Sequence, residues 1–219
     1  MSTVSKEDYL RVIYKNLEDG ILVNASLIAE QLQISNAAVS EMLRKLSNEK
    51  YLSYVPYRGI QLLQKGKIEA VKLVRRHRIW ETFLYEVIKV PWYKIDEEAE
   101  NLEHSSSDDL IDRLEGFMNN PEFDPHGHPI PRKNGFVPKQ KKLVKLSEFK
   151  VNKSGFVRKV NDQSSELLHH LFEIGLTIGK KFSVIEKRNF DNSMVIEIEN
   201  RNHTVSEKLA QNVFAEILR

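Results

Sequence analysis

Residues 24–48 read NASLIAEQLQISNAAVSEMLRKLSN, and this stretch decides the fold of the N-terminal part of the chain. Apolar side chains recur at helical spacing over 24–32 and again over 36–48, with a tight connection between the two runs. Ala29 provides a small side chain where the two helices would approach each other. Two short helices joined in this way are typical of a helix-turn-helix, whose second helix enters the major groove of DNA.

The residues that follow predict a wing beside this motif. Two β-rich runs, YLSYV (51–55) and IQLL (60–63), are joined by a turn with Arg58 at its tip. A hairpin directly after a helix-turn-helix makes a winged helix, and a helical pattern over 5–17, capped by Ser5, supplies its first helix. The alternative is a small helical core with a purely structural hairpin.

In a winged helix, the outward residues at the start of the second helix of the motif face the bases. Small side chains such as Ala37 and Ala38 suit contacts with thymine methyl groups, whereas Arg44 and Lys45 suit phosphates. No Arg stands at the helix start for a bidentate guanine contact, so specificity is expected to rest partly on DNA shape. The predicted DNA contacts are Ser35, Asn36, Ala37, Ala38, Ser40, Arg44, Lys45 and Arg58.

The stretch 95–112, IDEEAENLEHSSSDDLID, contains eight Asp and Glu residues and no basic residue. On a helix, Glu100, Glu103 and His104 share one face, where each like-charged pair costs roughly 0.2–0.5 kcal/mol. A solvated acidic face, helped by the helix dipole, is one interpretation. The other is a metal site, because carboxylate oxygens next to an imidazole nitrogen suit a divalent first-row cation.

Two further groups of ligand-type residues lie outside this stretch. A long helical pattern over 67–87 places His77 and Glu81 four residues apart, on one helix face. The irregular segment 119–138, which contains five prolines, includes the motif DPHGH (124–128). Its imidazoles and carboxylate are candidate metal ligands, although the same residues also suit a simple turn.

The last third of the chain changes to short alternating runs, which predict a small barrel of about 70 residues. Strands are expected at 156–160, 181–186, 194–198 and 202–205, and helices at 164–172 and near 206–212. An amphipathic helix is expected earlier, over 108–118, and a basic linker over 139–145.

Composition and charge limit the possible functions of these 219 residues. With 41% hydrophobic and 29% charged residues and no cysteine, the chain is an ordinary globular protein without disulfides or thiolate metal sites. No apolar run approaches the roughly 20 residues of a membrane helix, so we expect a cytoplasmic protein without a membrane partner. Charge is segregated, at +7 over 36–78, −10 over 81–124 and +9 over 132–160, which favours a polyanion and a cation as partners.

With these motifs together, the sequence resembles the diphtheria-toxin-repressor family of metal-dependent regulators, and within it the manganese transport regulators. The matching stretches are KEDYLRVIY (6–14), VSEMLRKL (39–46), YRGIQL (57–62), RRHRIWETFL (75–84), AENLEHSSSDDLIDRL (99–114) and DPHGHPIP (124–131). The resemblance implies a mainly α fold with a small β part. Its expected domains are a winged helix-turn-helix DNA-binding domain (1–65), a helical metal-binding and dimerisation domain (66–140) and an SH3-like (FeoA-like) β-barrel (141–219).

The resemblance also implies two metal sites. It assigns a principal site to Asp8, Glu100, Glu103 and His104, with Asp8 and Glu100 standing where iron-type members have Met and Cys. It assigns a secondary site to His77, Glu81, Asp124 and His126, with Asp162 or Gln163 as candidates to close it. Asp124 replaces a Cys, Asp96 replaces a His ligand of iron-type members, and Arg11 replaces a Glu ligand of the small manganese regulators.

The resulting hypothesis is a manganese-dependent repressor that binds double-stranded operator DNA as a metal-activated homodimer and controls metal-uptake genes. An iron-dependent repressor of the same family is the nearest alternative, because Fe²⁺ binds such sites at least as tightly as Mn²⁺. A di-metal carboxylate enzyme is a second alternative, but Glu-x-x-His is not repeated on two helices and no activated nucleophile is evident. A winged-helix regulator of a small organic ligand would leave the acidic stretch unexplained, so neither enzyme activity nor such a ligand is expected.

Overall fold

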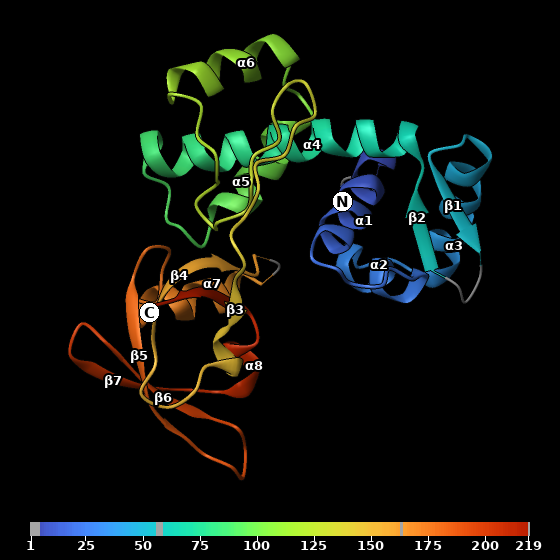
Figure 1. Cartoon of the computed structure of the whole chain (residues 1–219). Coiled ribbons are helices and arrows are strands. Elements are labelled where there is room, and N and C mark those ends of the chain that lie inside the picture. Colours follow the sequence, from blue (N-terminus) through green and yellow to red (C-terminus); the bar gives the residue numbers. More distant parts are fainter. Residues whose placement is uncertain (1–4, 56–58, 163, 219) are drawn as a thin grey trace. The chain divides into compact units, whose positions relative to one another are not determined.

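The computed structural model describes residues 5–55, 59–162 and 164–218. Its contacts divide the chain into two compact units: unit 1 is Met1–Arg76 with Pro131–Phe136, and unit 2 is His77–Ile130 with Val137–Arg219. The boundary falls inside the long helix α4 (Gln64–Phe83), labelled in Figure 1, and each unit is therefore described by itself.

Unit 1 begins with three short helices whose starts are fixed by polar caps. They are α1 (Lys6–Glu18), α2 (Ala25–Leu32) and α3 (Asn36–Asn48). The side chains of Ser5, Asn24 and Ser35 accept hydrogen bonds from backbone N–H groups of the first turns. Gln33 ends α2 in the left-handed conformation, with φ 52°, and turns the chain into α3. The predicted helix-turn-helix is confirmed.

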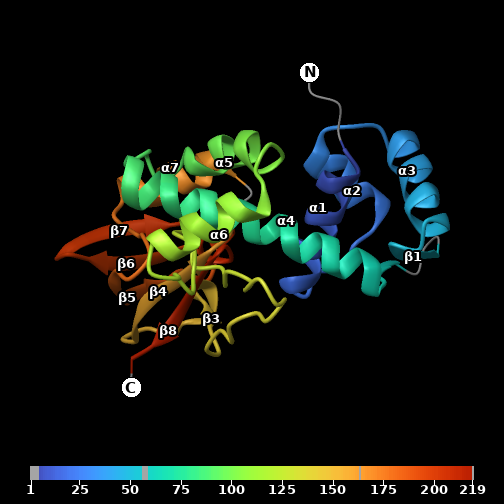
Figure 2. The same cartoon turned by 90° about the horizontal axis from the view of Figure 1, so that it is seen from above.

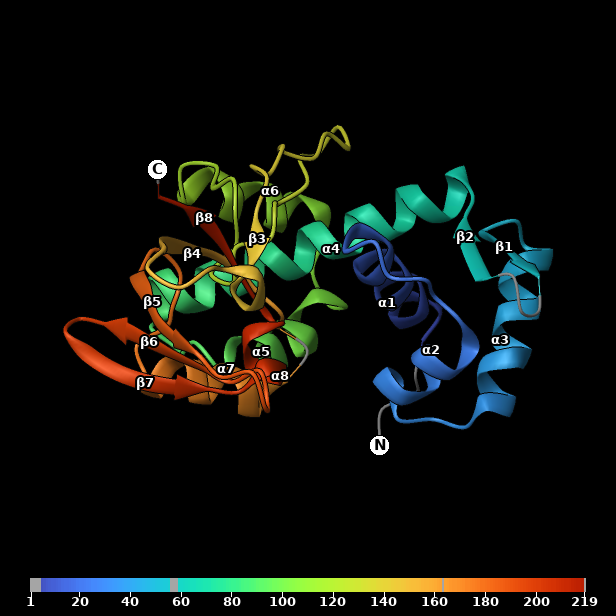
Figure 3. The same ribbon diagram turned by 60° about the horizontal axis from the view of Figure 1, so that its bottom comes forward.

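Besides the segment Pro131–Phe136, unit 1 contains a two-stranded hairpin and the first part of α4 (Figure 3). Strands β1 (Leu52–Val55) and β2 (Gly59–Leu62) pair antiparallel, with Leu52 opposite Leu62. Fully buried side chains of every element form one core, including Leu10, Ile28 and Leu43. The hairpin tip, and with it the predicted DNA contact Arg58, lies outside the described residues.

The helical part of unit 2 continues α4 and adds η1 (Leu84–Ile88), α5 (Ile95–Glu103) and α6 (Asp108–Phe117). The helix predicted over 67–87 is present, but its last turn widens into the π-helix η1. The acidic stretch is not one continuous helix, because α5 ends at Glu103 and Ser107 caps α6 by accepting from the backbone N of Leu110.

The rest of unit 2 is one antiparallel sheet of six strands in the order β3-β8-β4-β5-β6-β7 (Figure 3), which confirms the predicted SH3-like class. Its elements are β3 (Val144–Lys145), η2 (Leu146–Glu148), β4 (Ser154–Val160), α7 (Ser165–Glu173), β5 (Lys181–Lys187), β6 (Met194–Ile198), β7 (Arg201–Val205), α8 (Glu207–Ala210) and β8 (Val213–Ile217). Several elements differ from the prediction. β3 lies at the end of the segment expected as a basic linker, 139–145, and η2 was not predicted. The closing helix is only one turn long, and β8 follows it because Val213 and Ala215 alternate into the core.

A continuous core joins α5 to the barrel within unit 2. Ile95 and Ala99 of α5 are fully buried in the same cluster as barrel residues such as Phe182. Tyr93, just before α5, contacts the ring of His169 on α7 at 4.5 Å between centroids, and Figure 2 shows these two helices near each other. This core fixes the ligand-type residues of α4 and α5 against the barrel. Among the described helices, none is long and apolar enough to cross a membrane.

Candidate metal centre

Buried acids and imidazoles of α4 and α5 contact one another in unit 2. His77 and Glu81, one turn apart on α4, are 2% and 0% exposed. His77 Nδ1 lies 2.7 Å from Glu103 Oε2, and His77 Nε2 lies 3.1 Å from Asp96 Oδ1. Glu81 Oε1 lies 3.5 Å from His77 Nε2 and 3.2 Å from His126 Nδ1. Glu81 therefore stands between two imidazoles that come from different segments.

The turn 124–128 brings His126 to this place. Asp124 Oδ1 accepts hydrogen bonds from the backbone N of His126 and of His128, both at 2.9 Å, and so shapes the turn. The turn is docked on β4, where the backbone N of Val160 donates to the His126 carbonyl at 3.0 Å. Gly127 has φ +89°, and a Cβ there would lie 1.9 Å from the carbonyl oxygen of Arg158, so only glycine permits this approach.

Within the described residues of unit 2, two groups of three residues have geometry suited to a metal ion. The first is His77, Glu81 and Asp96, the second is Glu81, His126 and Asp162, and in each one donor atom per residue lies within 4.8 Å of the others. Glu81 belongs to both groups. Its second carboxylate oxygen, Oε2, is buried without a hydrogen-bond partner among the described residues, which leaves a donor available for a cation. The site thus fits an oxygen- and nitrogen-liganded divalent ion such as Mn²⁺ or Fe²⁺.

The electrostatics of the second group match a dication. Glu81 and Asp162 supply two negative charges, and the imidazole of His126 supplies a neutral ligand when it is deprotonated. Burial lowers the pKa of His126, but the hydrogen bond and charge of Glu81 outweigh it and raise that pKa to about 9. For Glu81, burial raises the pKa, yet the charge of His77 and the hydrogen bond from His126 hold it well below its usual range. A bound dication would take the place of the protons that the imidazoles hold.

Asp124, predicted as a ligand of the secondary site, has other contacts in the structure. Its Oδ2 lies 3.5 Å from Nε of Arg78, a guanidinium that is 2% exposed and donates through Nη1 to the carbonyl of Pro129 at 2.7 Å. Neither three-residue group contains Asp124, whereas Asp162, two residues after β4, joins Glu81 and His126. A metal-ligand role for Asp124 stays a prediction. Gln163 lies outside the described residues.

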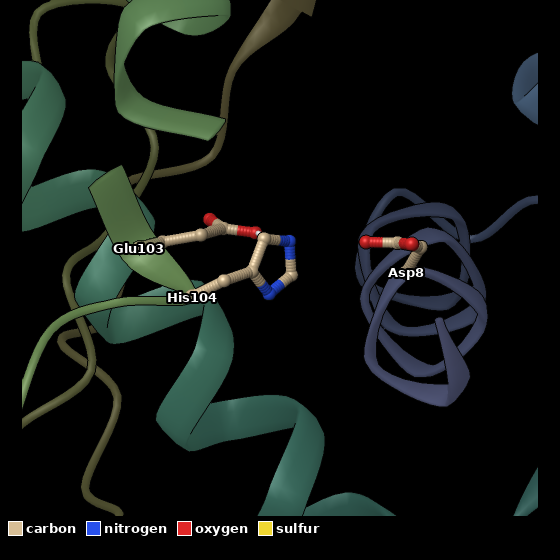
Figure 4. Close-up of side chains that lie close together, drawn as sticks. All are labelled: Asp8, Glu103 and His104. Carbon is tan, nitrogen blue, oxygen red and sulfur yellow. Dashed lines mark ion pairs between the residues drawn. The ribbon is translucent and has the colours of Figure 1, made fainter. Parts of the chain in front are cut away.

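The residues predicted for the principal site are placed in their own units. Glu103 and His104 extend from the end of α5 (Figure 4), with His104 Nε2 3.4 Å from Glu103 Oε1. Glu103 is fully buried, and Glu100 is half-buried on the same helix. Asp8 lies in the first turn of α1 (Figure 4), where its carboxylate accepts from the backbone N of Ser5 at 2.6 Å and completes a capping box. Asp8 therefore stabilises α1 whatever else it binds.

The predicted DNA contacts of α3 form an accessible surface at its N-terminal end. Asn36, Ala37 and Ala38 are exposed, as are Arg44 and Lys45 further along the helix. Two hydroxyl residues of the prediction differ from these: Ser35 is exposed but caps the helix, with Oγ accepting from the backbone N of Ala38, and Ser40 is half-buried. Contact of these residues with bases and phosphates stays a prediction.

A winged helix in one unit and buried hard-ligand residues in the other define a class, namely DNA-binding regulators that respond to a divalent metal. Comparison with known protein families agrees. The family described as "Iron dependent repressor, N-terminal DNA binding domain" matches residues 1–60, "Iron dependent repressor, metal binding and dimerisation domain" matches 63–132, and "FeoA domain" matches 144–217.

Individual relatives extend this result. "Iron-dependent repressor IdeR" of Mycobacterium tuberculosis is 37% identical over 125 residues, which cover 57% of this chain and 54% of the relative. "HTH-type transcriptional regulator MntR" of Oceanobacillus iheyensis is 36% identical over 154 residues, covering 70% of this chain and 98% of the relative. A solved manganese-dependent transcriptional repressor in complex with manganese is 30% identical, with a TM-score of 0.89 over 98% of this chain and 100% of that chain.

The match thus spans about half the length of the mycobacterial relative and nearly all of the Oceanobacillus one. This chain belongs to the iron-dependent repressor family, a family of metal-dependent, DNA-binding transcriptional repressors and not of enzymes.

Proposed function

We propose that this chain is a manganese-dependent transcriptional repressor that binds operator DNA as a metal-activated homodimer and controls metal-uptake genes. The observation that carries the proposal is the donor set of the buried groups. Every donor is a carboxylate oxygen or an imidazole nitrogen, and the chain has no cysteine. Hard oxygen ligands suit Mn²⁺, whereas thiolate ligands favour softer metals. The solved relative with bound manganese supports the same choice.

Glu81, His126 and Asp162 would hold one cation, with His77 and Asp96 beside Glu81. The family resemblance adds a principal site at Asp8, Glu100, Glu103 and His104. The bound cation supplies positive charge, which neutralises carboxylates that otherwise repel one another. An iron-dependent repressor is a second candidate, favoured by the name of the mycobacterial relative and by the tighter binding of Fe²⁺ expected from the Irving–Williams order.

Operator binding is expected to require the metal. Duplexes would first be selected from a random library with the Mn²⁺-loaded chain, and affinity then measured by fluorescence anisotropy. Excess Mn²⁺ should strengthen binding by about 5- to 150-fold over excess chelator, the usual range of coupling between two sites. Equal affinity in Mn²⁺ and in chelator would contradict the proposal.

Parallel titrations with Fe²⁺ under anaerobic conditions and with Mg²⁺ distinguish the two candidate metals. Activation by Mn²⁺ at concentrations at which Fe²⁺ gives a weaker DNA complex supports the manganese regulator, whereas the reverse supports the iron regulator. Mg²⁺ serves as the control for a general effect of divalent charge on DNA binding.

Asp8→Ala is expected to separate metal binding from DNA binding. Glu100, Glu103 and His104 remain to bind metal, but the winged helix loses its proposed ligand, so most metal-dependent operator binding should disappear. Both quantities are measured on one sample, by calorimetry and anisotropy. Because Asp8 also caps α1, Ser5→Ala, which removes the other half of the capping box, controls for helix stability. Parallel loss of metal and DNA binding, or no loss of either, would rule out a coupling role.

A further inference from the structure

His128 is a buried imidazole that the proposed ligand set does not use. It is 3% exposed, and its Nδ1 has no hydrogen-bond partner among the described residues. Two carboxylate oxygens face this nitrogen, Asp124 Oδ2 at 3.5 Å and Asp162 Oδ2 at 3.8 Å. Buried polar atoms of native proteins are nearly always hydrogen-bonded, so this arrangement requires an explanation.

The two carboxylates belong to different segments of unit 2. Asp124 opens the turn that presents His126, and Asp162 follows β4. Ionised carboxylates can only accept hydrogen bonds, so the nitrogen between them must donate. Both distances exceed hydrogen-bond length, and a shift of about 1 Å by Asp162 would bring its oxygen within range of Nδ1.

The charges around His128 indicate to which of the two carboxylates its Nδ1–H donates. Asp124 already faces the buried guanidinium of Arg78, with 3.5 Å between Oδ2 and Nε. Asp162 is instead a member of the three-residue group with Glu81 and His126. Carboxylates that bind a metal are in turn hydrogen-bonded, which fixes their orientation, and the loss of such a partner commonly weakens metal binding.

We propose that His128 is a positioning residue of the buried metal centre, and that its Nδ1–H orients the Asp162 carboxylate toward Glu81 and His126. The proposal rests on the metal dependence proposed above. It gives the two histidines of the DPHGH motif different roles, since His126 would bind the metal and His128 would hold the ligand contributed by the barrel.

The test uses the full chain with Asp8→Asn and His104→Ala, so that the buried centre is the remaining site. Into this background go His128→Asn, whose amide lies where the Nδ1 of histidine lies, and His128→Gln, whose amide reaches the position of Nε2. Mn²⁺ affinity is measured by calorimetry and by the electron paramagnetic resonance signal of free Mn²⁺. We expect His128→Asn to stay within about threefold of the background and His128→Gln to bind about 10- to 100-fold more weakly.

A double-mutant cycle tests whether the effect passes through Asp162. In an Asp162→Asn chain, His128→Gln should change affinity by less than about threefold, because the carboxylate that it positions is gone. His170→Gln, at an exposed histidine of α7, is the matched control and should change nothing. Thermal unfolding in chelator is recorded for each variant. A purely structural role of His128 would lower the stability of both variants and would leave their Mn²⁺ affinities equal.

Nuclear magnetic resonance of the ¹⁵N-histidine-labelled background chain, with Cd²⁺ as a diamagnetic probe, needs no variant of His128. The ¹⁵N chemical shift of His128 Nδ1 should be that of a nitrogen that carries a proton, and it should change when Cd²⁺ binds. Equal affinities of the Asn and Gln variants, additive losses in the cycle, or an Nδ1 signal that does not respond would each overturn the proposal. If the background chain bound no Mn²⁺, the proposed metal centre itself would be wrong. If it bound Mn²⁺ but the affinity did not depend on His128 as described, only the role of His128 would be wrong.

Discussion

Replacing Glu81 with glutamine is expected to lower the Mn²⁺ affinity of the buried centre by at least about 100-fold, more than the loss of a supporting residue would. Glu81 is the residue common to both three-residue groups, and its side chain is fully buried between His77 and His126. The substitution removes one of the charges that balance the dication and replaces an anionic oxygen with a neutral amide of nearly the same shape. No other described carboxylate belongs to both groups, so none replaces the negative charge that Glu81 loses.

The measurement is Mn²⁺ titration by calorimetry, with metal content counted after dialysis against a low Mn²⁺ concentration. Glu86→Gln changes the same residue type at an exposed position of η1 and is the matched control. One bound ion fewer per chain is expected for Glu81→Gln and an unchanged number for Glu86→Gln. A Glu81→Gln chain that retained the parent's stoichiometry and affinity would place the metal elsewhere.

Gly127→Ala is expected to destabilise unit 2 by about 3–5 kcal/mol, through backbone strain and overpacking together. The added Cβ would lie 1.9 Å from the carbonyl oxygen of Arg158, which is backbone and cannot rotate away, and φ is +89°. The turn would have to leave β4, and the hydrogen bond from Val160 to the His126 carbonyl would break. His126 would then be displaced from Glu81, so Mn²⁺ affinity should fall with stability.

Urea unfolding in chelator measures this effect, with the signal of Trp92 as a local probe because its indole Nε1 donates to the carbonyl of Pro125 in the neighbouring segment. Gly179→Ala is the control, since φ is +82° there but no atom lies within 4 Å of the added Cβ. It should cost only the roughly 1–2 kcal/mol of a left-handed residue. Equal losses of unfolding free energy for Gly127→Ala and Gly179→Ala would show that the close approach of Gly127 to β4 does not contribute to stability.

Helices of this protein can be predicted from the sequence because their signals are local. Ser5, Asn24 and Ser35 each precede a helical apolar pattern and each caps a helix. The widening of α4 into η1 had no such signal, since the residues of 84–88 fit either an α or a π turn. Strand β8 was missed because five residues directly after a short helix give too brief an alternation to stand out.

The sequence predicts which types of residue are candidate metal ligands, but it does not predict which of these residues come together in the structure. The pattern of α4 predicts that His77 and Glu81 share a face, since i and i+4 are neighbours on any helix. Asp124 and Asp162 were both plausible partners of His126, and the structure groups His126 with Asp162 because the 124–128 turn is docked on β4. That docking depends on a contact between residues more than 30 positions apart, which no local pattern records.

The position of β8 in the sheet has a consequence for how the chain folds during its synthesis. Among the described strands β8 comes last in the sequence, yet it lies between β3 and β4, with Val213 opposite Val160 near the end of β4. Until β8 has left the ribosome, the edge of β4 that it covers has no partner strand, and we expect Asp162, two residues beyond β4, to lack a fixed position. We therefore expect a nascent chain without β8 to leave the group of Glu81, His126 and Asp162 incomplete, so that the proposed metal centre forms only once β8 has paired with β4.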